Sequence, residues 1–451
     1  MTSVSCLSIV LAAGKGTRMR SDLPKVLHPI AHLPMVGHVL RSARDAGSDQ
    51  IAVVVGHGAD KLRDWLDPTV ETYVQTEQLG TAHAALAARD AIARGAEEVL
   101  VLFGDTPLLT AATLKRARAA VRGGGAAIAV VGFEAADPTG YGRLLIENGE
   151  LVAIREHRDA TADEREIRLC NGGIMAFNGA TMLTLLDEIG GDSGEYYLTD
   201  AVEVAKRKGL RSEVVVADEH EVLGVNDRAQ LATAEAIWQD RRRRVLLQSG
   251  VSMQAPDTVH LAFDTVIEPD ASVGPFVVFG PAVRIEQGAT VLSHSHIEGA
   301  MIRSGATVGP FARLRPGTDV GPGAKVGNFC EVKNATLADQ AKVNHLTYIG
   351  DASVGASANI GAGTITCNYD GANKHRTEIG ARAFIGSNSS LVAPVRIGDG
   401  AYVASGSVVT KGVEDDALAF GRARQANRTG GGKALRERVQ AEKARLAEAA
   451  E

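Results

Sequence analysis

A six-residue spacing of apolar side chains after Gly250 limits what this 451-residue chain can fold into more than any other feature. The spacing is interrupted only by single-residue slips and by one insertion between Ile360 and Ile379, and chance alternation would not sustain it. It is the hexapeptide signature of a parallel β-helix, in which each turn has three short strands and the apolar residues point inwards. The series comprises Ile267, Val273, Phe279, Ile285, Val291, Ile297, Ile302, Val308, Leu314, Val320, Val326, Val332, Leu337, Val343, Ile349, Val354, Ile360, Ile379, Ile385, Leu391, Ile397, Val403 and Val409.

The composition agrees with such a coil. The chain has 50 glycines, which allow tight turns, and few aromatic residues, with 10 Phe, 7 Tyr and 2 Trp. Only slim side chains fit the interior of a narrow coil, so a shortage of aromatic residues is expected there. A length of 451 residues exceeds what one hydrophobic core usually serves, and we expect two or three domains.

Residues before the coil follow a different pattern, in which short continuous apolar runs alternate with helix-length segments. Continuous runs are typical of buried parallel strands, and their alternation with helices predicts a doubly wound, Rossmann-like α/β sheet. The expected strands cover residues 7–12, 51–55, 99–103 and 126–131, and the expected helices 35–46, 81–94 and 110–122. Ligands of such sheets lie beyond the carboxyl ends of the strands, so the residues that follow each strand are the candidates for function.

One long helix is predicted between the two patterns, over residues 227–249, with Asn226 or Asp227 as its cap. Its four consecutive arginines, Arg241 to Arg244, are interpreted as cations near a helix C-terminus, with a phosphate or membrane patch as the alternative. We therefore divide the chain into an α/β domain over 1–227, a connecting helix over 228–249, and the coil with a C-terminal tail over 250–451.

Several classes of protein are disfavoured by composition and charge. The 48 basic and 54 acidic side chains give a net charge of −6, which is too mild to indicate a nucleic-acid surface. The four cysteines follow no metal-binding spacing and are predicted to be free thiols. The sequence has no apolar run of membrane-spanning length and no signal-peptide pattern at its N-terminus, so we expect a cytoplasmic protein without membrane contact.

The first candidate site begins in the loop after the first expected strand. This loop reads Leu11-Ala12-Ala13-Gly14-Lys15-Gly16-Thr17-Arg18-Met19, and Lys25 follows it. Its glycines let the backbone approach a ligand, and loop amides at a helix N-terminus can hold phosphates. The whole string resembles the signature of sugar nucleotidyltransferases, which join a sugar 1-phosphate to a nucleoside triphosphate and release pyrophosphate.

The chemistry of that reaction explains the charged residues nearby. Negative charge accumulates between two anionic molecules, so catalysis depends on charge neutralisation and alignment, for which Arg18 and Lys25 are the candidate cations. Asp105 follows the strand predicted to end at Phe103, and its carboxylate suits Mg²⁺ carrying the triphosphate; a helix cap is the alternative reading. The resemblance implies a second metal ligand at Asn226.

Four further motifs narrow the resemblance. They are QTEQLGTAHA at 75–84, PTGYGR at 138–143, EHRDA at 156–160 and NGGI at 171–174. With them, nearly the whole chain resembles the family of bifunctional N-acetylglucosamine-1-phosphate uridylyltransferase / glucosamine-1-phosphate N-acetyltransferases.

This resemblance implies contacts for each part of the first substrate pair. Gln75 and the turn at Gly80 and Thr81 would read the uracil, because amide and backbone groups suit that task. The implied contacts to the acetamido sugar are Gly142, Glu156 and Asn171. The implied nucleotide contacts also include Leu11, Ala12, Ala13, Gly14, Phe103 and Gly104, with Phe103 standing where the family often has tyrosine.

The second candidate site lies in the coil. Polar residues at successive turns stack into one patch on the side of a coil, so we expect Arg315, Lys333 and Tyr348 to converge, and two cations and a hydroxyl suit a sugar phosphate. Acetyl transfer from a thioester to an amine needs a base for the amine proton. His345, in a motif that resembles the family's acetyltransferase site, is the candidate catalytic base.

The resemblance supplies the remaining coil contacts and an assembly. It implies sugar contacts at Arg315, Lys333, Tyr348 and Asn359, and acetyl-CoA contacts at Ala362, Asn368, Tyr369, Ser387, Ser405 and Arg422. The insertion after Ile360, which contains Lys374, is where a functional loop is expected. Hexapeptide coils of this kind are left-handed and usually form trimers with sites between neighbouring coils, so a homotrimer is implied.

The resulting hypothesis is a two-step enzyme. The coil acetylates glucosamine 1-phosphate with acetyl-CoA, and the α/β domain then converts the product and UTP to UDP-N-acetylglucosamine, which feeds peptidoglycan and lipopolysaccharide synthesis as the resemblance implies. One alternative is a single-activity sugar-nucleotide pyrophosphorylase with a structural or regulatory coil. Another is a metal-binding coil of the carbonic-anhydrase kind, suggested by His294 and His296 on one strand face. The sequence leaves the role of the tail over 430–451 open.

Overall fold

The computed structural model describes residues 5–56, 59–190 and 195–449, which form two compact units. The first unit consists of Met1–Gly250, Ala255–Thr265 and Phe279–Ala282, and the second of Val251–Gln254, Val266–Val278 and Val283–Glu451. The last two residues of the predicted tail lie outside the described part. The long helix predicted between the two patterns belongs to the first unit.

The first unit is built on a nine-stranded sheet whose main path runs β11-β7-β10-β6-β1-β4-β5. Its strands are β1 (Cys6–Ala12), β4 (Gln50–Val55), β5 (Glu71–Val74), β6 (Glu98–Phe103), β7 (Ile128–Glu134), β8 (Arg143–Glu147), β9 (Glu150–Arg155), β10 (Leu169–Asn178) and β11 (Ser212–Ala217). A separate two-stranded pair joins β2 (Pro29–Ile30) to β3 (Leu33–Pro34).

The predicted strands are present, but the sheet also contains a strand, β10, that runs antiparallel to its neighbours. β1 pairs in parallel with both β4 and β6, and β7 pairs in parallel with β11. β7 and β6, however, are separated by β10, which runs antiparallel to both. The chain reaches β10 through the β8–β9 hairpin rather than through a long crossover helix, and a parallel neighbour requires a crossover.

Helices cover both faces of this sheet. They are α1 (Met35–Asp45), α2 (Asp60–Trp65), α3 (Thr81–Ala87), α4 (Arg89–Ile92), α5 (Ala111–Val121), α6 (Ala162–Arg165), α7 (Gly179–Leu186), α8 (Ala201–Arg207) and α9 (Arg228–Gln248). Short 3-10 turns are η1 (Thr17–Met19), η2 (Lys25–Leu27), η3 (Arg122–Gly124), η4 (Leu198–Asp200), η5 (Glu219–Val222) and η6 (Pro256–Thr258).

Two of the predicted helices bear directly on the sites. The helix expected over 81–94 is divided into α3 and α4, because Ala88 has a ψ of 25° and interrupts the helical backbone. The helix expected over 227–249 is confirmed as α9, and of its two candidate caps Asp227 is the one that caps it, accepting a hydrogen bond from the Gln230 amide at 2.9 Å.

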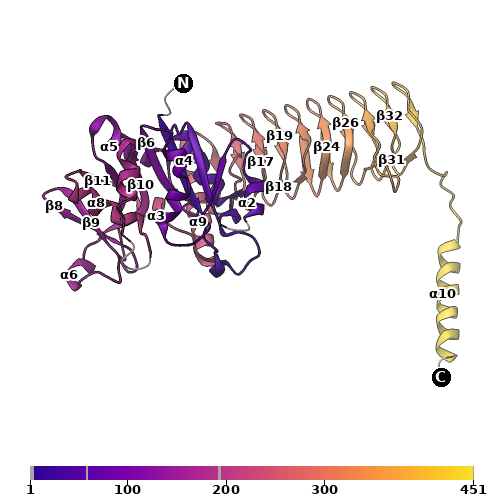
Figure 1. The fold of residues 1–451 in the computed structure, drawn as a ribbon. Coiled ribbons are helices and arrows are strands. Elements are labelled where there is room, and N and C mark those ends of the chain that lie inside the picture. Colours follow the sequence, from indigo (N-terminus) through magenta and orange to yellow (C-terminus); the bar gives the residue numbers. More distant parts are fainter. Residues whose placement is uncertain (1–4, 57–58, 191–194, 450–451) are drawn as a thin grey trace. The chain divides into compact units, whose positions relative to one another are not determined.

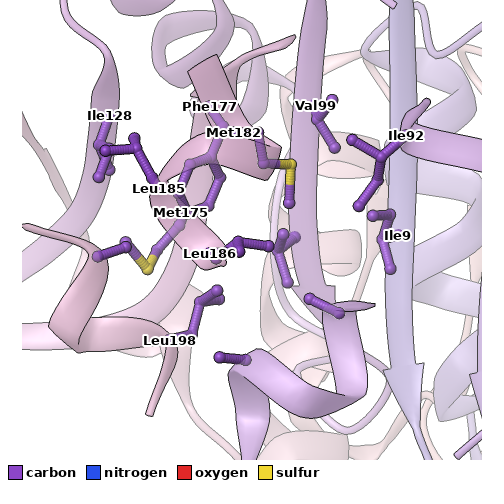
Figure 2. Close-up of a cluster of buried hydrophobic side chains, with 14 of the residues drawn as sticks. Ile9, Ile92, Val99, Ile128, Met175, Phe177, Met182, Leu185, Leu186 and Leu198 are labelled. Carbon is purple, nitrogen blue, oxygen red and sulfur yellow. The ribbon is translucent and has the colours of Figure 1, made fainter. Parts of the chain in front are cut away.

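The core of the first unit lies in two layers, one on each face of the sheet. Successive residues of β1 alternate between them, so that Ile9 packs in one layer and Val10 in the other, and both are fully buried. Figure 2 shows the first layer, to which β10 contributes Phe177 and α7 contributes Met182. The sheet therefore holds the carboxyl ends of β1 and β6 rigidly at one edge.

The second unit is a left-handed parallel β-helix whose turns stack as successive rungs (Figure 1). One of its sheets contains β12 (Ser252–Met253), β14 (Ser272–Val273), β17 (Thr290–Val291), β20 (Thr307–Val308), β23 (Lys325–Asn328), β25 (Lys342–His345), β27 (Asn359–Ile360), β30 (Phe384–Ile385), β33 (Tyr402–Val403) and β35 (Leu418–Ala419).

The remaining strands form a 14-stranded sheet that continues across the other sides of the coil. They are β13 (Val266–Ile267), β15 (Val278–Phe279), β16 (Arg284–Ile285), β18 (His296–Ile297), β19 (Ala300–Ile302), β21 (Arg313–Leu314), β22 (Thr318–Val320), β24 (Glu331–Leu337), β26 (Tyr348–Val354), β28 (Ile365–Cys367), β29 (Thr377–Ile379), β31 (Ser390–Val392), β32 (Val395–Ile397) and β34 (Val408–Val409).

The coil interior confirms the six-residue spacing in full. All the apolar residues of the predicted series lie on strands, and none is more than 6% exposed. Parallel register aligns them along each face, for example Val326 with Val343 and Val343 with Ile360. A residue in one turn is therefore stacked on a residue about 17 or 18 positions earlier or later, except across the insertion.

Two further expectations concern the cysteines and the tail. All four cysteines are free thiols, and Cys6, Cys170 and Cys330 are buried. The tail forms α10 (Gly431–Glu448), a helix without buried residues. Among the described residues, no helix has the length and apolar character needed to cross a membrane.

Neighbouring residues on β32 provide a test of the inward packing. Ile397 is 1% exposed, whereas Arg396 points outwards and is exposed. Ile397→Ala is expected to cost about 2–5 kcal/mol, because it leaves a cavity that the rigid coil cannot close. Arg396→Ala should change stability by less than about 0.5 kcal/mol. Denaturant unfolding followed by the circular dichroism of the strands measures both, and equal losses would contradict inward packing.

Candidate active sites

A cavity of about 420 Å³ opens beyond the carboxyl ends of β1 and β6, where the doubly wound fold predicts a ligand. It brings together the first loop, Lys25, the turn at Gly80 and the end of β6. Its lining consists of Leu11, Ala12, Ala13, Gly14, Gly16, Lys25, Val26, Gln75, Gln78, Gly80, Thr81, Ala84, Phe103, Asp105, Glu195 and Tyr197. Most of the predicted nucleotide contacts therefore surround one space.

Lys25 is the central cation of this cavity. Its ammonium forms an ion pair with the Asp105 carboxylate and donates a hydrogen bond of 2.8 Å to Asn226 Oδ1. The Lys25 side chain is only 12% exposed. The predicted cation Lys25 and the two predicted metal ligands thus meet at one point, although Lys25 and Asn226 are 201 positions apart in the sequence.

The alternative reading of Asp105 as a helix cap is wrong. The helix that follows, α5, begins at Ala111, and its cap is Thr110, whose hydroxyl accepts a hydrogen bond from the Thr113 amide. The amide of Val225 bonds to the backbone carbonyl of Asp105 at 2.9 Å, which fixes the segment before Asn226 beside it. The Asp105 carboxylate is therefore free to face Lys25.

The turn at Gly80 is held by close backbone packing. Gly80 has a φ of 109°, and a Cβ at this position would clash with the backbone of Tyr196. The Ala82 amide bonds to the Tyr196 carbonyl at 2.9 Å, and the Thr81 hydroxyl accepts from the Leu198 amide at 2.9 Å. Gln75 is buried, and its amide nitrogen lies 3.3 Å from the Gly80 carbonyl.

The three predicted sugar contacts also lie together. A Cβ on Gly142 would be 3.5 Å from Glu156 Oε1 and 3.6 Å from Asn171 Cβ. The Asn171 amide bonds to the Gly142 carbonyl at 2.8 Å, and burial raises the pKa of Glu156. Glu156 lines a neighbouring cavity that shares Tyr197 with the nucleotide cavity.

Tyr197 is a cavity residue that the sequence did not reveal. The Arg158 guanidinium lies 5.5 Å from its ring centroid, and Arg158 Nη2 donates to its hydroxyl at 2.9 Å. It lies outside the motifs found in the sequence and reaches the cavity through the tertiary fold. Gly104 adjoins the cavity through its amide, which bonds to the Leu11 carbonyl at 2.9 Å.

Arg18 is the predicted residue that the structure does not bring to Lys25. It lies in η1, its side chain is exposed, and it is not part of the cavity lining. Gly16, just before it, has a φ of 59° and packs against Lys25, where a Cβ would clash with the lysine side chain. The loop thus presents Arg18 to solvent while its glycine touches Lys25.

In the coil, His345 belongs to a row of aligned residues. Asn328 pairs with His345 in the register of β23 and β25, and His345 Nδ1 lies 2.8 Å from Asn328 Oδ1. Each of Ala362, Ser387 and Ser405 follows a register-matched residue by two positions, those residues being Ile360, Ile385 and Val403. The predicted base and three predicted acetyl-CoA contacts therefore occupy equivalent positions on successive turns.

Arg422 lies close to the far end of this row. A Cβ on Gly406 would be 3.7 Å from Arg422 Cδ, and the Gly406 amide bonds to the Ser387 carbonyl at 2.8 Å. The row thus extends from the imidazole at one end to a guanidinium at the other, through small residues.

The predicted cations form a second group in the coil. Arg315 Nη1 donates to Glu331 Oε1 at 2.9 Å, and Glu331 pairs with Tyr348 in the strand register. Gly350 pairs with Lys333 and leaves space for the Tyr348 phenol, since a Cβ there would clash with the Tyr348 hydroxyl. Arg315, Lys333 and Tyr348 therefore converge as predicted.

Lys374 from the insertion joins this group. The pKa of Lys333 is lowered because its neutral amine can accept a hydrogen bond from Lys374 and because the two ammonium groups repel each other when both are charged. Asn359, the fourth predicted sugar contact, lies instead in β27 on the other sheet of the coil. Among the described residues, Asn359 has no recorded side-chain contact with the Arg315 group.

The insertion itself is an ordered loop that carries two predicted acetyl-CoA contacts. Asp370 closes it by accepting hydrogen bonds from the Ala372 and Asn373 amides and from His375 Nε2, and these bonds lower the pKa of Asp370. Asn368 is buried and donates to Asp351, whereas Tyr369 is 60% exposed.

The zinc alternative does not fit the coil. His294 has a φ of 59° and lies at a corner outside β18, and its ring stacks between Phe276 and Phe311 with centroids 4.9 Å from each. His294 and His296 therefore do not share a strand face. Within the described ranges, no group of three or more His, Cys, Asp or Glu residues could hold a metal ion.

The turn at Gly80 yields a local test. Gly80→Ala must displace the Tyr196 backbone, so the Ala82 and Leu198 amides should exchange with deuterium faster. Gly95→Ala is the control, because Gly95 also has a positive φ, of 83°, but has open space where its Cβ would lie. If these two amides exchange equally fast in both variants, the effect comes from backbone strain and not from the contact between Gly80 and Tyr196.

Comparison with known proteins supports both halves of this description. The family model described as a MobA-like NTP transferase domain matches residues 8–251, and that of the bacterial transferase hexapeptide, with six repeats, matches residues 376–411. The chain is thus similar to nucleotidyltransferases over its first unit and to hexapeptide transferases over part of its coil.

Full-length relatives match the two halves together. Proteins named "Bifunctional protein GlmU" from Agrobacterium fabrum and Rhodopseudomonas palustris are each 58% identical to this chain, over 97% of it and 98% of their own length. Another of the same name from Sinorhizobium medicae is 57% identical over 99% of both chains. The chain therefore belongs to the GlmU family of bifunctional enzymes, which join a nucleotidyltransferase domain to a hexapeptide-repeat acetyltransferase domain.

Proposed function

We propose that this enzyme carries out two successive reactions and that the residues described above perform them. The coil acetylates glucosamine 1-phosphate with acetyl-CoA, and the α/β domain transfers uridylyl from UTP to the product, giving UDP-N-acetylglucosamine and pyrophosphate. We assign the first reaction to residues 250–451 and the second to 1–227, joined by the helix over 228–249. The observation that carries the proposal is that each domain gathers its own predicted set of charged residues at one place.

In the uridylyl transfer, Lys25 is the proposed electrostatic catalyst. A sugar-phosphate oxygen attacks the α-phosphorus, the bond from that phosphorus to the bridging oxygen breaks, and pyrophosphate leaves with the electron pair. The Lys25 ammonium neutralises charge as it develops, which is effective because its side chain is 12% exposed and screened from water. Arg18 is exposed on a turn next to Gly16, from which it can approach the polyphosphate.

Asp105 and Asn226 are the proposed ligands of a Mg²⁺ ion. The donor set fits, because a carboxylate and an amide oxygen already converge on one cation, the Lys25 ammonium, and hard oxygen atoms are what Mg²⁺ prefers. Two protein ligands suffice, since Mg²⁺ usually keeps waters and substrate phosphates in its shell. When bound, the ion would supply charge stabilisation and orientation of the triphosphate.

The remaining contacts of the first domain select the substrates. We propose that the buried Gln75 amide and the backbone at Gly80 and Thr81 recognise uracil. Glu156 and Asn171 are the proposed hydrogen-bonding partners of the acetamido sugar, with Gly142 leaving space between them. The nucleotide then lies over Leu11 to Gly14, and over Phe103 and Gly104 at the end of β6.

In the acetyl transfer, His345 is the proposed base and Asn328 is its positioning residue. Because Asn328 Oδ1 accepts from Nδ1–H, the Nε2 lone pair is available for the proton of the attacking amine. The amine nitrogen then bonds to the thioester carbonyl carbon, the carbon–sulfur bond breaks, and coenzyme A leaves as the thiol. Asn328 lies 17 residues before His345, so the coil period would have revealed it.

The positions of the two coil substrates are proposed from the group of cations around Lys333 and from the row of aligned residues that contains His345. The sugar phosphate is the proposed partner of Arg315, Lys333 and Lys374, because an anion relieves the repulsion that lowers the pKa of Lys333. The Tyr348 hydroxyl lies beside them. Acetyl-CoA is proposed to lie along the row of aligned residues, contacting Ala362, Asn368, Tyr369, Ser387, Ser405 and Arg422.

A homotrimer is proposed because the sugar site is incomplete within one protomer. Asn359 lies on a different sheet of the coil from Arg315 and Lys333, and a neighbouring protomer could bring it to them. Light scattering should then give about three times 47.2 kDa. A monomer with full acetyltransferase activity would contradict the proposal.

We also propose a cytoplasmic location, to which free thiols are suited.

The two active sites should be separable by single substitutions. His345→Ala is expected to reduce thiol release from acetyl-CoA with glucosamine 1-phosphate by about 10²–10⁴-fold, and to leave pyrophosphate release from UTP and N-acetylglucosamine 1-phosphate unchanged. Lys25→Ala should reduce pyrophosphate release by about 10²–10³-fold and leave thiol release from acetyl-CoA unchanged. Chelation should abolish only the second activity. The matched controls are His260→Ala and Lys115→Ala, at exposed positions that belong to neither proposed site. An unchanged acetylation rate in His345→Ala would disprove the role of the base.

The pH dependence of acetyl transfer tests Asn328. In Asn328→Asp a carboxylate replaces a neutral acceptor and favours the imidazolium, so the acidic limb of the kcat/KM profile should move to higher pH by about one unit or more. Asn328→Ala should lower kcat/KM without that movement, because the tautomer is no longer held. If Asn328→Asp leaves the profile in place, Asn328 does not act through His345.

A further inference from the structure

The first unit contains a second cavity, of about 330 Å³, that neither reaction uses. It shares no lining residue with the nucleotide cavity. Its lining consists of His38, Arg41, Ser42, Asp45, Pro107, Leu108, Leu109, Thr110, Trp238, Arg241, Arg242, Val245 and Phe263. The volume is at the lower end of the range for small-molecule sites.

Positive charge predominates in this cavity. Three guanidinium groups, those of Arg41, Arg241 and Arg242, face it together with one carboxylate, that of Asp45. The Arg41–Asp45 ion pair is long, at 4.0 Å, and both side chains are more than half exposed. Arg241 also pairs with Asp218 outside the lining, with Arg241 Nη2 3.7 Å from Asp218 Oδ1. Three guanidinium groups therefore stand against two carboxylates, and the excess charge of about +1 suits an anion.

The two arginines of α9 are held in place by backbone carbonyls. Arg241 Nη1 donates to the Leu108 carbonyl at 2.8 Å, and Arg242 Nη2 donates to the Thr265 carbonyl at 2.9 Å. Arg242 Nε is buried and has no hydrogen-bond partner within the described residues. Burial and the charge of Arg41 lower the pKa of Arg242, as expected for a half-buried cation beside another cation.

Beside the cations lies an apolar surface with two aromatic rings. Trp238 is half-buried and packs edge-on against His38, with ring centroids 6.0 Å apart. Burial lowers the pKa of His38, so this ring adds no charge near neutral pH. Phe263, Leu108 and Leu109 complete a surface on which a flat ring can stack.

We propose that this cavity binds a small phosphate monoester with a flat apolar group. The phosphate would face Arg41, Arg241 and Arg242, which can donate bidentate hydrogen bonds, and the ring would contact Trp238 and Phe263. This assigns a ligand to part of the arginine run. The other two members face elsewhere: Arg243 donates to the Val259 carbonyl at 3.3 Å, and Arg244 pairs with Asp240 at 2.9 Å.

The chain provides a reporter for this cavity. Trp65 and Trp238 are its two tryptophans, so in Trp65→Phe the tryptophan fluorescence comes from the cavity lining alone. The probe is phenyl phosphate, titrated into the full-length protein. We expect a saturable change in fluorescence, and calorimetry on the unaltered protein should give the same Kd. Inorganic phosphate and benzyl alcohol, which each supply half of the ligand, should bind at least tenfold more weakly.

Arg242→Gln, in the same background, should weaken phenyl phosphate binding at least tenfold, with Arg244→Gln as the matched control from the same run. Uridylyl transfer at the wild-type rate in both variants would show that each is folded. The proposal is overturned by the absence of a saturable change, by equal losses in the two variants, or by inorganic phosphate binding as tightly as phenyl phosphate.

Discussion

The stacking of one aliphatic side chain per coil face is the constraint on which the acetyltransferase half depends. Because each turn must bury the same kind of residue in the same place, the register between turns is fixed, and Val326, Val343 and Ile360 lie one above another. Whatever follows these residues by two positions is then aligned as well. The row that contains Asn328 and His345 is a consequence of interior packing, so the site inherits its geometry from the core rather than from a flexible loop.

The α/β half reaches the same result through a different constraint. The carboxyl ends of parallel strands lie at one edge of the sheet, and the residues after β1 and β6 therefore meet there. Lys25, Asp105 and Asn226 come from separate segments and still form a compact group. A cation between two oxygen atoms keeps these side chains ordered without a ligand, which lowers the conformational cost of binding an anion beside them.

The sequence predicted the regularly repeated elements well, and it predicted poorly those features that depend on tertiary packing. The spacing of the coil and the strand pattern of the first unit are repeated many times, so local errors do not alter the interpretation. The antiparallel course of β10 and the break at Ala88 depend on which segments pack together, and no local signal marks them. The same holds for Tyr197. Asn328 differs, because its distance of 17 residues from His345 is about one coil turn and was available in the sequence.

The four consecutive arginines of α9 have different surroundings and therefore do not share one role. Successive residues of an α-helix point about 100° apart, so four in a row face nearly all directions and cannot serve one purpose. In α9, Arg241 and Arg242 face a cavity, Arg243 is directed to the backbone at Val259, and Arg244 pairs with Asp240. The interpretation of the run as cations at a helix end is wrong, because the last turn of α9 contains no basic residue, and the exposed Arg244 pairs instead with Asp240. Nor does that interpretation explain Arg242, whose buried Nε lacks a partner in the described structure, and an unpaired buried donor is costly enough to indicate a ligand.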